Sequence, residues 1–152
     1  MPDIHLRSAD LGPDDTWRLV QWCFENGADE FSVVCLAAAS RDAPFCAASQ
    51  RTLEPFSLPR ALRPHLTRRP SAPYTRETRL WRLNSHALTL LKTLLPDGLF
   101  TDRQGNDDGW IEDPTIYRDR ELLLGVITHE DVATLRATEQ ELGRLRELNL
   151  LP

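Results

Sequence analysis

Glycine is scarce in this chain of 152 residues, and its seven glycines are not clustered. The glycine-rich loops that bind phosphates or dinucleotides, and the G-x-S-x-G turn that carries a nucleophilic serine, therefore do not occur. The sequence also has no apolar run approaching the roughly 18 residues of a membrane-spanning helix. No secretory signal is visible at its start. We expect a cytoplasmic protein that makes no membrane contact and lacks the common phosphate-cofactor chemistries.

Cysteine is also rare, with Cys23, Cys35 and Cys46 spaced 12 and 11 residues apart. This spacing matches neither a C-x-x-C redox motif nor a zinc knuckle. A free thiol behaves as a small apolar side chain and is commonly buried. We therefore expect three buried free thiols in a reducing compartment.

Charge is distributed unevenly along the chain, although the net charge is only −5. An arginine-rich segment, residues 51–82, holds eight arginines against two acids, a balance of +6. An acidic segment, residues 97–131, holds ten acids against three arginines, a balance of −7. Either the two segments pair with each other in the fold, or each faces a different partner. The net negative charge argues against nucleic acid as a partner of the whole surface.

The hydrophobic pattern predicts a single α+β domain spanning residues 1–152. We expect an antiparallel or mixed sheet of about five to six strands, covered by about three helices, with a C-terminal β-meander followed by a helix. The predicted helices are 13–25, 84–95 and the stretch from 138 onward. The predicted strands are 4–7, 31–37, 78–83, 110–118, 122–128 and 132–136. Helix starts are indicated by Pro13, by Asn84 or Ser85, and by the T-x-x-E capping box of Thr138 and Glu141.

An irregular segment rich in proline and arginine is predicted at about 54–76. Six of the eleven prolines fall between positions 44 and 73, where they interrupt any regular helix or central strand. Here we expect a short strand at 46–53, a helical turn or two at 58–66, and an exposed loop at 68–74. Gly125, inside an apolar strand, predicts a bulge or a close approach of another backbone.

The stretch DRQGNDDGWIED resembles the core of an EF-hand calcium loop. Asn106, Asp108 and Gly109 occupy the third, fifth and sixth positions of that motif. Gln104 and Thr115 stand where the first Asp and the bidentate Glu belong, so two ionised ligands are missing. We expect a solvated acidic turn or an acidic recognition loop here, and no calcium site.

A second cluster combines Glu112 and Asp113, at the start of one predicted strand, with the turn between the next two strands, which holds His129, Glu130 and Asp131. In an antiparallel meander these residues approach the same end of the sheet. Carboxylates beside an imidazole suit a transition metal or general acid–base chemistry. Their spacing, however, matches no metal motif such as H-E-x-x-H.

These observations favour a protein-interaction module over an enzyme. The module would be a small soluble protein of the accessory, inhibitor or immunity type. Its acidic surface would bind a basic protein partner without any cofactor. Trp110 lies among charged residues in the sequence, a composition that is typical of an interface hot spot. The first alternative is a hydrolase-type enzyme with a carboxylate and histidine site, with or without a metal. The second is weak binding of RNA or single-stranded DNA through the arginine-rich segment. The predicted partner-binding residues are Asp107, Asp108, Trp110, Glu112, Asp113 and His129.

Overall fold

The computed structural model of the protein describes residues 1–36, 43–66, 74–100 and 109–152. In these ranges the chain forms one seven-stranded antiparallel sheet and four α-helices. The predicted α+β class is confirmed. The counts need correction, because the sheet has seven strands instead of five to six and the helices number four instead of three.

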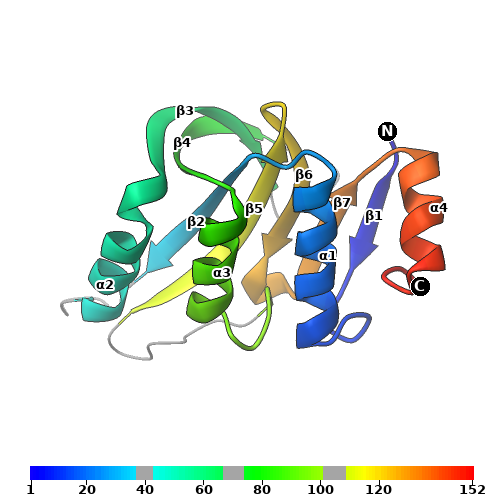
Figure 1. Ribbon diagram of the computed structural model, residues 1–152, viewed down its shortest axis with the longest axis horizontal. Coiled ribbons are helices and arrows are strands. Elements are labelled where there is room, and N and C mark those ends of the chain that lie inside the picture. The colour runs from blue at the N-terminus through cyan, green and yellow to red at the C-terminus, as the bar shows by residue number, and fades with distance from the viewer. Residues whose placement is uncertain (37–42, 67–73, 101–108) are drawn as a thin grey trace.

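The elements follow one another along the chain as Figure 1 shows. The strands are β1 (Asp3–Leu6), β2 (Glu30–Leu36), β3 (Ser57–His65), β4 (Tyr74–Arg82), β5 (Trp110–Arg118), β6 (Glu121–Ile127) and β7 (Val132–Arg136). The α-helices are α1 (Pro13–Glu25), α2 (Pro44–Leu53), α3 (Ser85–Leu94) and α4 (Glu139–Glu147). Two short 3-10 helices, η1 (Glu54–Phe56) and η3 (Thr128–Glu130), complete the described structure.

Local capping signals account for where the helices begin. Pro13 opens α1, where its missing N–H costs no hydrogen bond. The Asn84 side chain caps α3 by accepting from the N–H of Ala87 at 2.8 Å. Thr138 and Glu141 form the predicted capping box of α4, each side chain accepting a hydrogen bond from the other residue's backbone. These three predicted helix starts are confirmed.

Two expectations for the irregular segment are wrong. The predicted strand at 46–53 is helix α2, which starts at Pro44. The predicted helical turn at 58–66 lies in strand β3, apart from its last residue. Proline is compatible with β3 because this strand lies at the edge of the sheet, where some backbone N–H groups need no partner. The loop predicted at 68–74 falls outside the described residues, except for Tyr74, which begins β4.

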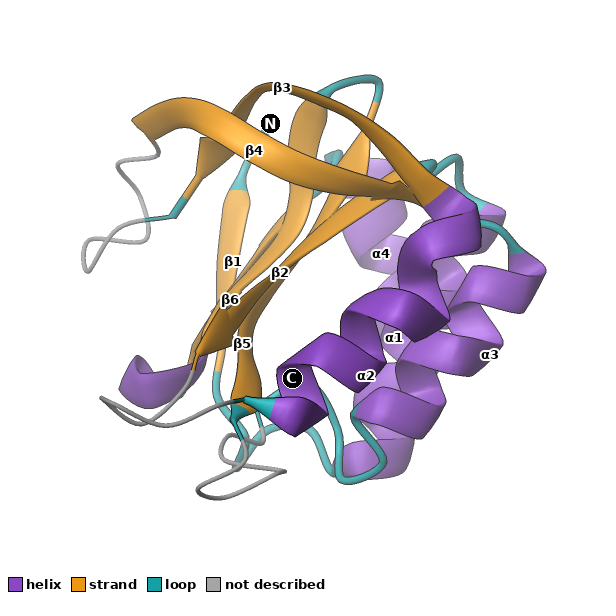
Figure 2. Ribbon diagram, turned by 90° about the vertical axis from the view of Figure 1, so that its left-hand side faces the viewer, coloured by secondary structure: helices purple, strands orange, loops and turns teal. Residues whose placement is uncertain are grey.

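The sheet has the strand order β1-β7-β6-β5-β2-β4-β3, so the predicted C-terminal meander of β5, β6 and β7 is confirmed. All four helices lie on one side of the sheet, and the hairpin of β3 and β4 bends away from them (Figure 2). Three strands separate β3 from β6 in the sheet, yet β3 contacts β6. The sheet is therefore strongly curled, and its edge hairpin closes over the ends of β5 and β6.

The main core lies between the helices and the sheet and includes the fully buried Val20, Leu91 and Leu135. Cys23 and Cys46 are buried and Cys35 is half-buried, and all three thiols are free. The expected free thiols are confirmed, although Cys35 is less buried than predicted. Burial raises the pKa of the Cys23 thiol to about 12, so this group remains protonated and unreactive.

Candidate metal centre

Glu112 and Asp113 of β5 and His129 of η3 come together at one end of the meander. Each offers one ligand atom, and these atoms all lie within 4.8 Å of one another. The carboxylates belong to half-buried residues and the imidazole to an exposed one. Three of the six predicted site residues therefore form one cluster, which is open to solvent on the histidine side.

A β-bulge explains how two consecutive residues of a strand reach the same cluster. Side chains of neighbouring strand residues normally point to opposite faces of the sheet. Opposite β2, however, Glu112 pairs with Val34 and Thr115 pairs with Ser32, so β5 contains one extra residue between these pairs. Asp113 takes up this extra length with a left-handed backbone, φ 51°. The bulge thereby turns its carboxylate towards that of Glu112.

Hydrogen bonds hold Asp113 against the 3-10 helix that carries the histidine. The Asp113 N–H donates to Thr128 Oγ1 at 2.9 Å, and the Thr128 N–H donates to Asp113 Oδ1 at 2.8 Å. Because Thr128 is buried and precedes His129 directly, this pair of bonds holds the backbone that carries the imidazole next to β5. Asp113 Oδ2 has no hydrogen-bond partner among the described residues.

The other carboxylate is also held through one oxygen. The indole Nε1–H of Trp110 donates to Glu112 Oε1 at 2.8 Å, and Oε2 has no partner in the described part of the chain. His129 Nε2 lies 3.5 Å from Glu130 Oε1, at the exposed rim. Each carboxylate thus has one oriented oxygen and one oxygen available to a ligand. This resembles the outer hydrogen bonding that orients carboxylate ligands in metal sites.

A small pocket of about 40 Å³ adjoins this cluster and shares Asp113 with it. It lies inside the curl of the sheet, where residues 65, 66, 74 and 76 of the β3–β4 hairpin face residues 113, 115, 126 and 127. Gly125 makes this contact possible, because a Cβ there would lie 2.8 Å from Leu66 Cδ1. A close approach at Gly125 was predicted for another backbone, and the structure corrects this, because the approaching group is the Leu66 side chain.

The wall of this pocket contains a hydrogen-bond network centred on His65, which is only 4% exposed. The Thr78 hydroxyl donates to the Arg76 carbonyl at 3.0 Å, so it accepts from His65 Nε2–H at 2.7 Å. Tyr117 OH lies 2.9 Å from the same nitrogen, and Arg76 Nη2 approaches Nδ1 at 3.4 Å. Burial, reinforced by the positive charge of Arg76, lowers the pKa of His65 to about 4, so the imidazole is neutral.

The sequence did not single out His65 as a site residue. Its position depends on β3 folding back over β5 and β6, a contact between segments about 50 residues apart in sequence. The only local signal was the occurrence of His65, Tyr74 and Arg76 in one arginine-rich segment. That composition indicated weak binding of nucleic acid and did not predict a pocket.

The remaining predicted site residues are placed as follows. Asp107 and Asp108 lie outside the described residues, as does most of the EF-hand-like stretch. Trp110 is half-buried, with its indole bonded to Glu112. The predicted pairing of the arginine-rich segment with the acidic segment is not seen in two ion pairs of the described residues. Arg63 pairs with Glu30 and Arg79 pairs with Glu54, and both glutamates precede the acidic segment.

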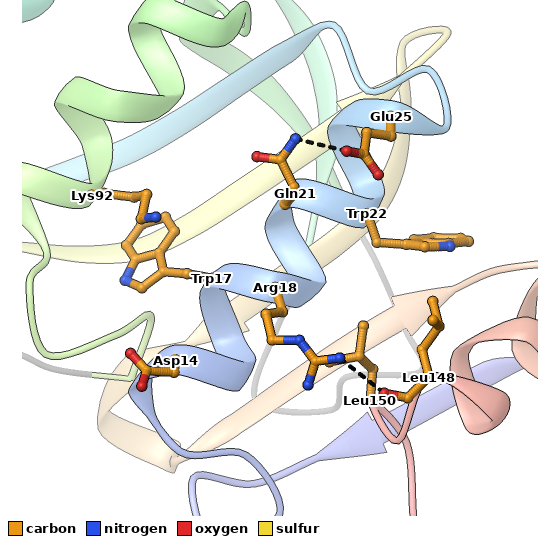
Figure 3. A pocket seen from close by; sticks show the side chains of 9 residues that line it. All are labelled: Asp14, Trp17, Arg18, Gln21, Trp22, Glu25, Lys92, Leu148 and Leu150. Carbon is orange, nitrogen blue, oxygen red and sulfur yellow. Dashed lines mark hydrogen bonds between the residues drawn. The ribbon is translucent and has the colours of Figure 1, made fainter.

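A larger groove of about 440 Å³ lies on the helical side, along α1 (Figure 3). Its floor includes Trp17 and Trp22, which are only 7% and 6% exposed. At its rim, Gln21 donates to Glu25 at 3.0 Å, and Arg18 donates to the Leu148 carbonyl at 3.1 Å. The first of these bonds lies within α1, and the second joins α1 to the segment after α4.

None of the helices in the described ranges has the length and apolar character needed to cross a lipid bilayer. No protein-family model matches the chain, and it matches neither a curated protein nor a solved structure.

Proposed function

We propose that Glu112, Asp113 and His129 bind one divalent transition-metal ion and that this centre supports hydrolysis. The observation that carries the proposal is the bulge at Asp113, which aims two consecutive carboxylates at one imidazole. A regular strand would place these two carboxylates on opposite faces. The left-handed backbone conformation of Asp113, with φ 51°, costs free energy, and backbone strain of this kind is concentrated at functional sites.

The ligand set favours zinc and its neighbours over calcium or magnesium. Calcium and magnesium take oxygen ligands, whereas an imidazole together with carboxylates suits zinc, manganese or iron. Three protein ligands leave coordination positions for water and substrate, as in catalytic rather than structural zinc sites. A metal ion of this kind lowers the pKa of a bound water to about 7 and polarises a carbonyl or phosphoryl oxygen. The centre is therefore suited to hydrolysis at neutral pH.

Metal titration tests this proposal directly. The purified protein is stripped with a chelator, and Zn²⁺ is added in a calorimeter, with Co²⁺ added in parallel to follow its visible absorption. We expect one ion per chain, and an affinity at least about tenfold lower in His129→Ala and Asp113→Asn. Asn tolerates the left-handed backbone of position 113, so this variant removes charge with little effect on the bulge.

The matched control is His86→Ala, which removes an exposed histidine from α3, away from the cluster. It should bind zinc like the parent protein. Absence of stoichiometric binding in the parent protein would contradict the proposal. Equal affinity in the parent and His129→Ala would do the same.

A second candidate function is the protein-interaction module, in which the acidic segment binds a basic partner protein. It is favoured by the ion pairs of Arg63 with Glu30 and of Arg79 with Glu54, because these two arginines engage carboxylates that lie outside the acidic segment. A basic peptide such as oligo-arginine is a suitable probe. Binding that weakens with salt and in Glu130→Gln, but is unaffected by a chelator, would favour this function over the metal centre.

A further inference from the structure

We propose that the pocket beside the metal centre is an oxyanion subsite, in which Arg76 binds the phosphoryl group of a phosphomonoester. This inference rests on the proposed metal function and names its substrate class. Asp113 belongs both to the cluster of possible metal ligands and to the pocket wall, so the two sites are contiguous.

Among the described residues, Arg76 has only neutral hydrogen-bond partners, unlike the three arginines that form two-nitrogen ion pairs. Arg63, Arg118 and Arg136 each donate to a carboxylate through two nitrogens, at distances of 2.7–3.4 Å. Arg76 instead approaches Tyr74 OH at 3.3 Å and His65 Nδ1 at 3.4 Å, and no carboxylate of the described chain forms an ion pair with it.

These contacts position the guanidinium of Arg76 without neutralising it. Its Cζ lies 5.8 Å from the centre of the Tyr74 ring, within the range of a cation–π contact. Both hydrogen bonds are long, so they are easily exchanged for charge-assisted bonds to an anion. A guanidinium held in this way suits bidentate recognition of phosphate or carboxylate.

The size and charge of the site favour a compact oxyanion bound next to a metal. A pocket of about 40 Å³ accommodates roughly three water-sized groups, which matches the oxygens of one phosphoryl group. Without a metal, Glu112, Asp113 and Arg76 together carry one negative charge. A divalent ion changes the sum of these charges to one positive charge, so an oxyanion should bind the metal-loaded protein more tightly than the metal-free protein.

A phosphoryl group also has enough oxygens to contact a metal ion and a guanidinium at the same time. In the reaction that follows, the oxygen of a water forms a bond to phosphorus and the bond from phosphorus to the ester oxygen breaks. One proton of the water goes to the departing alcohol, and the products are the alcohol and inorganic phosphate. No oxidant or further reactant is needed.

The test measures binding of inorganic phosphate, with and without one equivalent of Zn²⁺, in the parent protein and in Arg76→Gln. We expect phosphate to bind the zinc-loaded parent at least about tenfold more tightly than the zinc-free protein. Arg76→Gln should lose at least about tenfold in phosphate affinity while its zinc affinity stays within about twofold. Zinc-dependent hydrolysis of p-nitrophenyl phosphate should decrease in the same variant.

Arg60→Gln is the matched control, because Arg60 is exposed on the same hairpin but does not line the pocket. It should leave phosphate binding unchanged, and both variants should unfold at the same urea concentration as the parent. Unchanged phosphate affinity in Arg76→Gln, or tighter binding of acetate than of phosphate, overturns the subsite while the metal centre stands. Failure of the parent to bind zinc overturns both proposals.

Discussion

Asp113 and Thr128 exchange two hydrogen bonds, each residue donating its backbone N–H to the side chain of the other, at 2.9 and 2.8 Å. The exchange joins the bulge of β5 to the 3-10 helix η3, two elements that are separated by the whole of β6. It also stabilises the left-handed conformation of Asp113. Thr128 therefore positions two members of the cluster without contacting a metal itself.

Replacing Thr128 with valine should weaken both the fold and the metal centre. The valine keeps the shape of the side chain but leaves the Asp113 N–H without its acceptor, at a cost of about 1–3 kcal/mol. Loss of such an orienting group lowers metal affinity by roughly 10–100-fold. Urea unfolding and zinc titration measure the two effects. Thr128→Ser keeps the hydroxyl and should retain zinc affinity, so equal losses in both variants would refute the positioning role.

Much of the fold could be predicted because its signals are local. The capping box of Thr138 and Glu141, the cap at Asn84 and the proline at position 13 each mark a helix start within a few residues. Short polar turns between apolar runs predicted the meander of β5, β6 and β7. These features follow from backbone chemistry that does not depend on distant contacts.

The curl of the sheet and the bulge could not be predicted in the same way. Strand β3 contains Pro59 and Pro64, and it forms because an edge position and the contact of Leu66 with Gly125 compensate for poor local propensity. The bulge depends on how β5 pairs with β2, which lies far away in sequence. The sequence therefore identified Glu112, Asp113 and His129 as a group, but it gave no indication of the adjoining pocket.

Stability should fall as the pH drops below about 6.5, because His65 is buried and neutral. Its pKa is 6.5 in an exposed setting and about 4 in the fold. Between these values the unfolded chain binds a proton that the folded chain does not, so lowering the pH favours unfolding. From the two pKa values we expect a loss of about 2 kcal/mol between pH 7.5 and 5.

Urea unfolding at these two pH values measures the effect, which should shrink markedly in His65→Gln. His86→Gln, on the exposed face of α3, is the control and should retain the parent's pH dependence. The carboxyls of Asp3 and Glu141 do not interfere, because their arginine partners hold their pKa values below the usual range. Their stabilisation is lost only at lower pH. An unchanged pH dependence in His65→Gln would show that this imidazole is not the responsible group.

The ion pair of Glu30 with Arg63 should contribute far more than the pair of Glu54 with Arg79. Glu30 accepts from Arg63 at 2.8 and 3.0 Å, and the two side chains are only 17% and 9% exposed. Glu30→Gln leaves a buried guanidinium without its counter-charge, which costs about 3–5 kcal/mol. Glu54 lies 3.4 Å from Arg79 and is 67% exposed, so Glu54→Gln should cost less than about 1 kcal/mol. Urea unfolding of both variants tests the difference, and similar losses would contradict it.

Two glycines should respond to alanine in opposite directions. Gly143 lies within α4, where a Cβ would meet no atom within 4 Å, so Gly143→Ala should stabilise the protein by about 0.5–1 kcal/mol through its higher helix propensity. Gly98 has φ 101°, and a Cβ there would lie 2.9 Å from Thr16 Oγ1 and 3.2 Å from Pro13 Cα. Gly98→Ala should therefore destabilise by more than about 1 kcal/mol. Thermal and urea unfolding of the two variants measure these changes, and a stabilising effect of Gly98→Ala would mean that the turn after α3 adopts another backbone conformation.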